Sequence, residues 1–123
     1  MDNKFKLFDA EYKFMEIVWK HEPVNSTELT KICDKILRWK KPTTYSMIKK
    51  LCARGILKNE KATVSTLIAQ EDVKKYEVEV LLDKFFGGSV PALIMTYMGD
   101  KFITKQEAMK IKLLADGITE RGT

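Results

Sequence analysis

One segment of the sequence is bounded as a helix at both ends and has two chemically different faces. Pro42 suits the first turn of a helix, where a missing N–H costs nothing, and Gly55 suits the left-handed residue after its end. At 3.6 residues per turn, the residues between them separate into an apolar face and a face of hydroxyls and cations. The apolar face holds Thr44, Met47, Ile48 and Leu51, and the polar face holds Thr43, Ser46, Lys49, Lys50 and Ala53. The pattern predicts one short helix with a buried inner side.

Two shorter helical patterns precede this segment. The first is expected over about residues 10–20, after an N-cap at Asp9. The second is expected over about residues 26–37, because Asn25 and Glu28 have the spacing of a capping box before an apolar stripe. Trp39, in the following connection, is expected in the core rather than as an aromatic wedge beside a nucleic-acid backbone.

After Gly55 the hydrophobic period changes from that of a helix to that of strands. Residues 56–58 are led by apolar side chains, and residues 63–68 are β-branched and alternating. Residues 59–62 are expected to form the tight polar turn between them. A helix-turn-helix followed at once by a hairpin is a winged helix, so we expect a winged-helix domain at residues 1–70, mainly α with a small β-hairpin.

The positive charge of the chain gathers on and around the bounded helix. The chain has 22 Lys and Arg residues and 17 Asp and Glu residues, which gives a net charge of +5. The segment from Lys31 to Lys61 contains ten Lys and Arg residues and only two acidic residues, Asp34 and Glu60. Such clustering supplies sequence-independent DNA affinity through counterion release. We therefore expect a recognition helix whose groove-facing residues are Thr43, Tyr45, Ser46, Lys49 and Lys50, with Lys41, Arg54, Lys58 and Lys61 on phosphates. The alternatives are a solvated surface, or a winged helix that binds protein or RNA.

Little in the sequence favours an enzyme, a cofactor or a metal. His21 is the only histidine, and no Gly-rich phosphate loop or carboxylate pair stands in a recognisable setting. Cys33 and Cys52 each fall on the apolar side of an expected helix, which predicts buried free thiols rather than a disulfide or metal pair. No apolar run approaches the roughly 18 residues of a membrane span and the first residues lack a signal-peptide core, so a cytoplasmic location is expected.

Residues 71–123 are expected to form three apolar helices. The first ends at Gly87 and Gly88, the second covers residues 89–98, and the third follows a Thr104–Glu107 capping box. A piece of fewer than about 60 residues rarely encloses enough surface to be stable alone, so we expect a helical dimerisation domain that pairs with a second copy. The alternative is a monomer whose helices pack back on the winged helix. The residues expected at the dimer contact are Leu82, Phe85, Phe86, Leu93, Ile94, Tyr97, Ile111 and Leu114.

The ordered set of segments resembles the penicillinase and methicillin-resistance repressors, the BlaI/MecI/CopY family, over the whole chain. The segments that carry the resemblance are Met1–Lys4, Ala10–Tyr12, Met15–Trp19, Thr43–Leu51 with Gly55, and Phe85–Ser89. The resemblance implies a homodimeric winged-helix repressor that binds a palindromic operator of β-lactam resistance genes. It also implies release from DNA by proteolysis in the dimerisation region, under the control of a membrane sensor peptidase.

The same resemblance places the cleaved bond at Thr96–Tyr97. The resistance repressors are cut at an Asn-Phe bond in a Leu-Val-Leu-Asn-Phe stretch. The corresponding residues here are Leu-Ile-Met-Thr-Tyr at 93–97, in which an aromatic residue is kept as Tyr97 and Thr96 stands in place of the Asn. The copper-responsive members carry Cys-x-Cys pairs near the C-terminus, and residues 112–123 contain no cysteine, so metal sensing is not expected. The alternative inducers are a small ligand or oxidation of Cys33 or Cys52.

Overall fold

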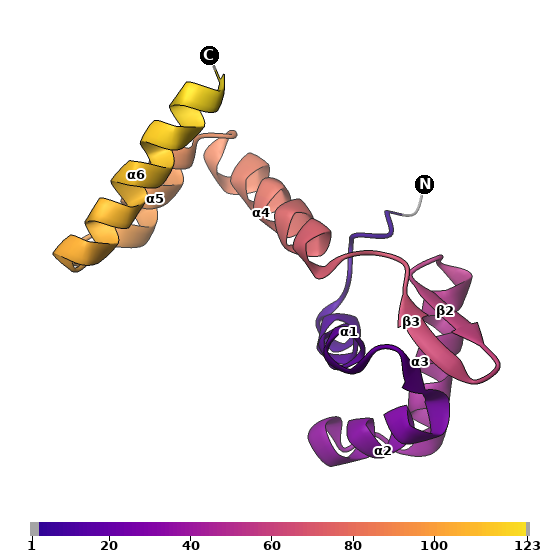
Figure 1. The fold of residues 1–123 in the computed structure, drawn as a ribbon. Coiled ribbons are helices and arrows are strands. Elements are labelled where there is room, and N and C mark those ends of the chain that lie inside the picture. The colour runs from indigo at the N-terminus through magenta and orange to yellow at the C-terminus, as the bar shows by residue number, and fades with distance from the viewer. Residues whose placement is uncertain (1–2, 123) are drawn as a thin grey trace. The chain divides into compact units, whose positions relative to one another are not determined.

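The computed structural model describes residues 3–122 of the chain, and the side chains of residues 3–118. It is mainly helical with one small antiparallel sheet, which confirms the predicted fold class (Figure 1). Two compact units, Met1–Leu81 and Leu82–Thr123, divide the chain within α4. The elements of the first unit, in order, are α1 Asp9–His21, β1 Val24–Asn25, α2 Ser26–Leu37, α3 Lys41–Ala53, β2 Leu57–Glu60, β3 Thr63–Thr66 and the first turns of α4 Gln70–Phe86.

Local signals in the sequence account for the ends of α1 and α2. The N-cap of α1 is Phe8 rather than Asp9, because the side chain of Glu11 accepts the hydrogen bond of the Phe8 N–H at 2.8 Å. Asp9, wrongly expected as the cap, is the first helical residue, where a carboxylate still favours the positive helix end. In α2 the side chain of Asn25 accepts hydrogen bonds from the N–H groups of Thr27 and Glu28, which confirms that cap.

The segment between Pro42 and Gly55 forms the expected helix, although Met47, expected on its buried side, is only half-buried. Pro42 lies in the first turn of α3, and Gly55 adopts a φ of +75° just after its end. Thr44, Ile48 and Leu51 are buried on the inner side. Against them pack α2 and β2, so the opposite side of α3 is left on the surface.

The sheet has three strands in the order β1-β3-β2, all antiparallel. The pairing of Glu60 with Thr63 leaves a two-residue turn, so the expected turn over residues 59–62 was two residues too long. Lys61 and Ala62 form this turn with φ values of +51° and +62°. The strand β1 was not predicted, and its backbone pairs Val24 with Val64.

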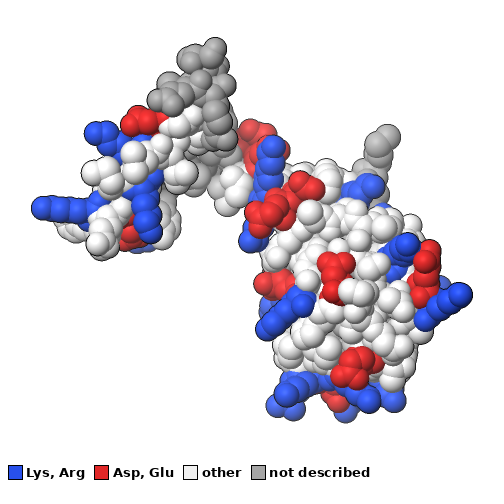
Figure 2. All heavy atoms as spheres, viewed as in Figure 1, with Lys and Arg blue, Asp and Glu red and all other residues white. Residues whose placement is uncertain are grey.

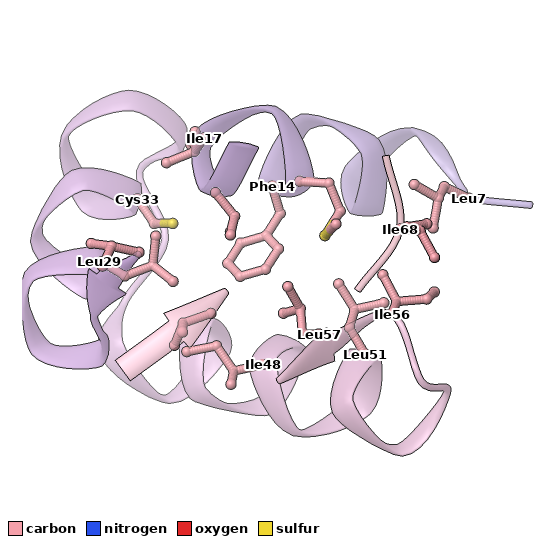
Figure 3. Packing of buried hydrophobic residues seen from close by; sticks show 14 of the residues in the cluster. Leu7, Phe14, Ile17, Leu29, Cys33, Ile48, Leu51, Ile56, Leu57 and Ile68 are labelled. Atoms are coloured by element: carbon pink, nitrogen blue, oxygen red, sulfur yellow. The ribbon is translucent and has the colours of Figure 1, made fainter. Parts of the chain in front are cut away.

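One continuous apolar core holds the first unit together (Figure 3). Phe14 of α1 lies at its centre, fully buried, and Trp39 stacks on it with ring centroids 5.8 Å apart and planes at 9°. This confirms the core position expected for Trp39. Other buried members of the core come from every helix and strand of the unit, namely Met15, Val18, Val24, Leu29, Cys33, Ile48, Leu51, Leu57, Val64 and Val73.

The second unit consists of the end of α4, α5 Val90–Met98 and α6 Lys105–Gly122. Ser89 caps α5 by accepting from the Ala92 N–H at 3.1 Å, and Thr104 and Glu107 form the expected capping box of α6. No residue of α5 is buried within the single chain. The role of residues 71–123 as a separate dimerisation domain, with its boundary at residue 70, stays a prediction.

Candidate nucleic-acid interface

The outward side of α3 carries the hydroxyls and cations that the sequence placed there. Thr43, Ser46 and Lys49 are exposed, and Tyr45 has an exposed fraction of 41%. A surface hollow of about 370 Å³ runs along this side, lined by Pro42, Thr43, Ser46, Met47 and Lys50. Short hydroxyls beside a concave strip of helix are suited to base edges, and the lysines around it are suited to phosphates.

Exposed cations continue from α3 onto neighbouring elements. Lys41 begins α3 and is exposed, and Lys31 and Lys35 are exposed on α2. Figure 2 shows one face of the first unit, in which Lys and Arg atoms gather along the lower edge, over α2. Acidic side chains lie among these cations, since Lys31 Nζ is 4.0 Å from a carboxylate oxygen of Glu28.

The hairpin contributes charge of both signs. Lys58 of β2 lies 3.5 Å from the carboxylate of Glu60, and both side chains are largely exposed. Lys61 is exposed at the turn, and a hollow of about 590 Å³ is lined by these three residues with Thr63 and Ser65. Because Glu60 offsets Lys58, the hairpin is a weaker candidate for phosphate binding than α3.

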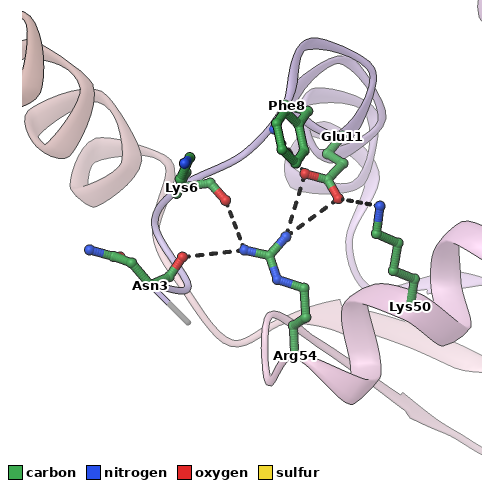
Figure 4. A network of polar contacts seen from close by, with 6 residues as sticks. All are labelled: Asn3, Lys6, Phe8, Glu11, Lys50 and Arg54. Atoms are coloured by element: carbon green, nitrogen blue, oxygen red, sulfur yellow. Dashed lines mark hydrogen bonds and ion pairs between the residues drawn. The ribbon is translucent and has the colours of Figure 1, made fainter. Parts of the chain in front are cut away.

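Arg54, expected at a phosphate, and Lys50, expected to face the groove, both contact a buried carboxylate in the free chain (Figure 4). Lys50 Nζ lies 2.9 Å from Glu11 Oε2, and Arg54 Nη1 lies 3.4 Å from each carboxylate oxygen. Arg54 Nη2 also donates to the backbone carbonyls of Asn3, at 3.2 Å, and Lys6, at 2.8 Å. The side chain of Arg54 is only 17% exposed, so it joins α3 to the N-terminal segment.

Glu11 was missed by the analysis of the sequence, although one signal marks it. It shares the apolar stripe of α1 with Met15 and Val18, and its exposed fraction is 2%. A carboxylate on an apolar stripe needs a charged partner from elsewhere in the fold. Burial acts to raise the pKa of Glu11, but the hydrogen bond from Phe8 and the charges of Lys50 and Arg54 hold that pKa below its ordinary value.

The two thiols are free, as expected, but unequally buried. Cys33 is fully buried, whereas Cys52 is half-buried. Burial raises the pKa of Cys33, opposed by the neighbouring Thr44 hydroxyl, and burial likewise raises the pKa of Cys52. Both thiols therefore carry little of the reactive thiolate at neutral pH.

The described part of the chain holds neither a metal-binding cluster nor a membrane-spanning helix. Among residues 3–118, no group of three or more His, Cys, Asp or Glu side chains is arranged to hold a metal ion. None of the helices described is long and apolar enough to cross a membrane.

The first unit has three helices, of which α3 has one side on the surface, and a hairpin in a three-stranded sheet. This arrangement defines the class of winged-helix proteins. Comparison with protein families agrees with this class, since the model described as "Penicillinase repressor" matches residues 7–117. The chain belongs to the penicillinase repressor family, which confirms the resemblance found in the sequence.

Individual relatives are distant but cover most of the chain. The chain is 23% identical over 106 residues to the penicillinase repressor of Bacillus licheniformis, covering 83% of each protein. It is 22% identical over 116 residues to the penicillinase repressor of Staphylococcus aureus, covering 91% of this chain and 92% of the relative. A solution structure of the DNA-binding domain of the repressor BlaI has a TM-score of 0.52 and 28% identity, covering 58% of this chain and 93% of that domain.

Proposed function

We propose that the chain is a cytoplasmic, homodimeric transcriptional repressor that binds a palindromic operator, controls β-lactam resistance genes and is inactivated by proteolysis. The observation that carries DNA binding is the outward side of α3, where the exposed hydroxyls of Thr43 and Ser46 line a hollow together with Lys50. Family membership and the similarity to the BlaI DNA-binding domain support the same proposal.

In this proposal the residues of α3 have two different tasks. Thr43, Tyr45 and Ser46 face base edges, where hydroxyls and an aromatic ring distinguish sequences, while Lys49 and Lys50 hold the backbone. Lys41, Lys58 and Lys61 are the further phosphate contacts proposed, with Lys58 weakened by Glu60. Arg54 reaches DNA only if it gives up its partners in the N-terminal segment, so its contribution to phosphate binding is the smallest of the set.

The division of tasks is tested by comparing Ser46→Ala with Lys49→Ala on a bound duplex and on base-substituted versions of it. Ser46→Ala should change the ranking of the duplexes, whereas Lys49→Ala should weaken all of them alike and lower the salt slope by about one unit. Lys13→Ala is the matched control, because Lys13 is an exposed lysine in the hollow between α1 and the start of α4. Equal behaviour of all three variants on every duplex would contradict the assignment.

The apolar surface of the second unit supports pairing with a second copy. Within the single chain, Phe85, Leu114 and Tyr97 have exposed fractions of 65%, 65% and 67%, and none of α5 is buried. Large apolar side chains exposed in this number on short helices are usually covered in solution. A homodimer would cover them and would present two copies of α3, about one helical turn of DNA apart, to a palindrome.

The proposed route of release from DNA is cleavage of the Thr96–Tyr97 bond. This cleavage is controlled by a membrane sensor peptidase. The bond lies in the last turns of α5, with both residues exposed and Lys101 Nζ 4.4 Å from the centre of the Tyr97 ring. Co-expression with the cognate sensor peptidase, followed by mass spectrometry, should give fragments that end at Thr96 and begin at Tyr97. Release of the operator by an intact chain would contradict this route.

Relief by thiol oxidation is the less favoured alternative. The raised pKa values of Cys33 and Cys52 make both thiols poor targets for oxidants at neutral pH. Relief by a small ligand remains an alternative, and an operator complex that dissociates with a ligand while the chain stays whole would support it.

A further inference from the structure

Three charges meet where the last turn of α3 crosses the start of α1. Glu11 brings one negative charge, and Lys50 and Arg54 bring two positive charges (Figure 4). The carboxylate is 2% exposed, so it requires a cationic partner at all times. Two cations surround one anion, and the cluster therefore holds one positive charge more than the carboxylate needs.

The two cations are held to different degrees. Arg54 is 17% exposed and is fixed by both carboxylate oxygens and by the carbonyls of Asn3 and Lys6. Lys50 is 54% exposed and approaches one carboxylate oxygen, at 2.9 Å. If Lys50 left, Glu11 would keep Arg54 and the Phe8 N–H, and the buried charge would stay compensated.

Lys50 also belongs to the outward side of α3. It lines the same hollow as Thr43 and Ser46, at the strip proposed to face DNA. The flexible four-carbon stem of a lysine allows its ammonium to reach either side of such a position. Lys50 thus has two anionic partners within reach once DNA arrives, an internal carboxylate and a backbone phosphate.

We propose that Glu11 is a positioning residue that competes with DNA phosphate for Lys50. In the free chain Lys50 is held by Glu11, and on DNA it exchanges to a phosphate while Arg54 retains the carboxylate. Breaking the internal pair lowers the affinity gained from the phosphate contact, so Glu11 restrains binding to DNA. This inference depends on the proposed DNA-binding function.

The test is a double-mutant cycle of Glu11→Gln and Lys50→Met, with affinity for a random-sequence duplex measured at about 0.05 M salt, where non-specific binding is stronger. Glu11→Gln keeps an acceptor for the Phe8 N–H and removes the competing charge. It should tighten binding by about fivefold, the factor that corresponds to an ion pair of this exposure. In the Lys50→Met background the same substitution should change the affinity by less than about twofold.

Glu71→Gln is the matched control for net charge. Glu71 is 82% exposed on α4 and pairs with Lys74 at 3.3 Å, so its substitution removes one negative charge without touching α3. The increase in DNA affinity caused by Glu11→Gln should exceed any increase caused by Glu71→Gln. Equal gains would show that net charge alone is responsible, and a loss of affinity in Glu11→Gln would show that Glu11 only holds α3 in place; both would overturn the proposal.

A measurement on the parent chain keeps the proposal testable if Glu11→Gln does not fold. The carbon-13 signal of the Glu11 carboxylate should shift when duplex is added to the parent, and should stay in place in Lys50→Met. An unchanged signal in a parent chain that binds the duplex would overturn the exchange of Lys50 but not the proposed DNA binding. A parent chain that binds no duplex would overturn the proposed function itself, and the exchange with it.

Discussion

The rings of Phe14 and Trp39 stack with their planes at 9° and their centroids 5.8 Å apart. Phe14 is fully buried in α1, and Trp39 lies in the short connection between α2 and α3. This contact fixes the connection against the core, and α3 leaves it in a defined direction. The orientation of the candidate interface therefore depends on an aromatic pair that does not itself reach the outward side of α3.

Replacement of Trp39 by Ala should destabilise the chain by about 2 kcal/mol, less than the loss for a fully buried aromatic residue because Trp39 is half-buried. Urea unfolding followed by circular dichroism measures the change. Phe8→Ala is the control, since Phe8 is 67% exposed and its loss should cost less than about 0.5 kcal/mol. Equal costs for the two variants would contradict the importance of the stack.

The turn of the hairpin carries strain that substitution should relieve. Ala62 has a φ of +62°, where an L-residue with a Cβ is disfavoured by about 1 kcal/mol relative to Gly. Ala62→Gly should therefore raise the free energy of unfolding by about 1 kcal/mol, whereas Ala10→Gly in α1 should lower it by up to about 1 kcal/mol. Thermal unfolding of both variants and the parent measures whether the two changes in stability have opposite signs. A lower melting temperature for Ala62→Gly would argue against the strained turn.

The charge of Glu11 should make part of the stability depend on pH. Its pKa in the folded chain lies below the ordinary value of 4.5, so folding favours the ionised form. This contribution is fully present above pH 4.5 and is lost as the pH falls through the folded pKa. Glu11→Gln should destabilise the chain by about 1–3 kcal/mol at pH 7, and this difference should shrink below pH 4.5.

Urea unfolding of the parent and Glu11→Gln at several pH values between 3 and 7 follows this dependence. Glu71→Gln, which changes an 82% exposed carboxylate, should follow the parent throughout. A Glu11→Gln difference that stays constant across the range would contradict a depressed pKa at this position.

The proposed dimer makes a clear prediction for α6. Leu114 is 65% exposed in the single chain, and Leu114→Asp places a charge on the proposed contact. Sedimentation equilibrium should show a dimer for the parent and a monomer, or a dimer weakened by at least about a hundredfold, for the variant. Lys112→Asp, at a position that is exposed but charged already, is the control and should stay dimeric. A parent chain that is monomeric would contradict the dimer.

The elements predicted best from the sequence are those defined by neighbours in the chain. The bounds of α2 are Ser26–Leu37 as expected, because the Asn25 cap and the apolar stripe both act within the helix. The outward placement of Thr43, Ser46 and Lys49 follows in the same way from the 3.6-residue period of α3.

Features that depend on distant partners were not predicted. The strand β1 has two residues and exists because Val24 meets Val64 across the sheet, which no local pattern shows. The turn at Lys61 lacks the Asn-Gly signal of such turns, so its length was overestimated. The pairing of Glu11 with Lys50 joins residues far apart in the chain, and only the fold brings them to 2.9 Å.

The most direct test of the account is selection of bound duplexes from a random DNA pool at about 0.15 M salt, where non-specific binding is weak. A dimeric winged-helix repressor should enrich a two-fold palindrome whose half-sites lie about one helical turn apart. The Ser46→Ala chain should enrich an altered half-site, while Lys13→Ala should enrich the parent site. A pool that stays random after repeated rounds, with a folded parent chain, would contradict sequence-specific repression.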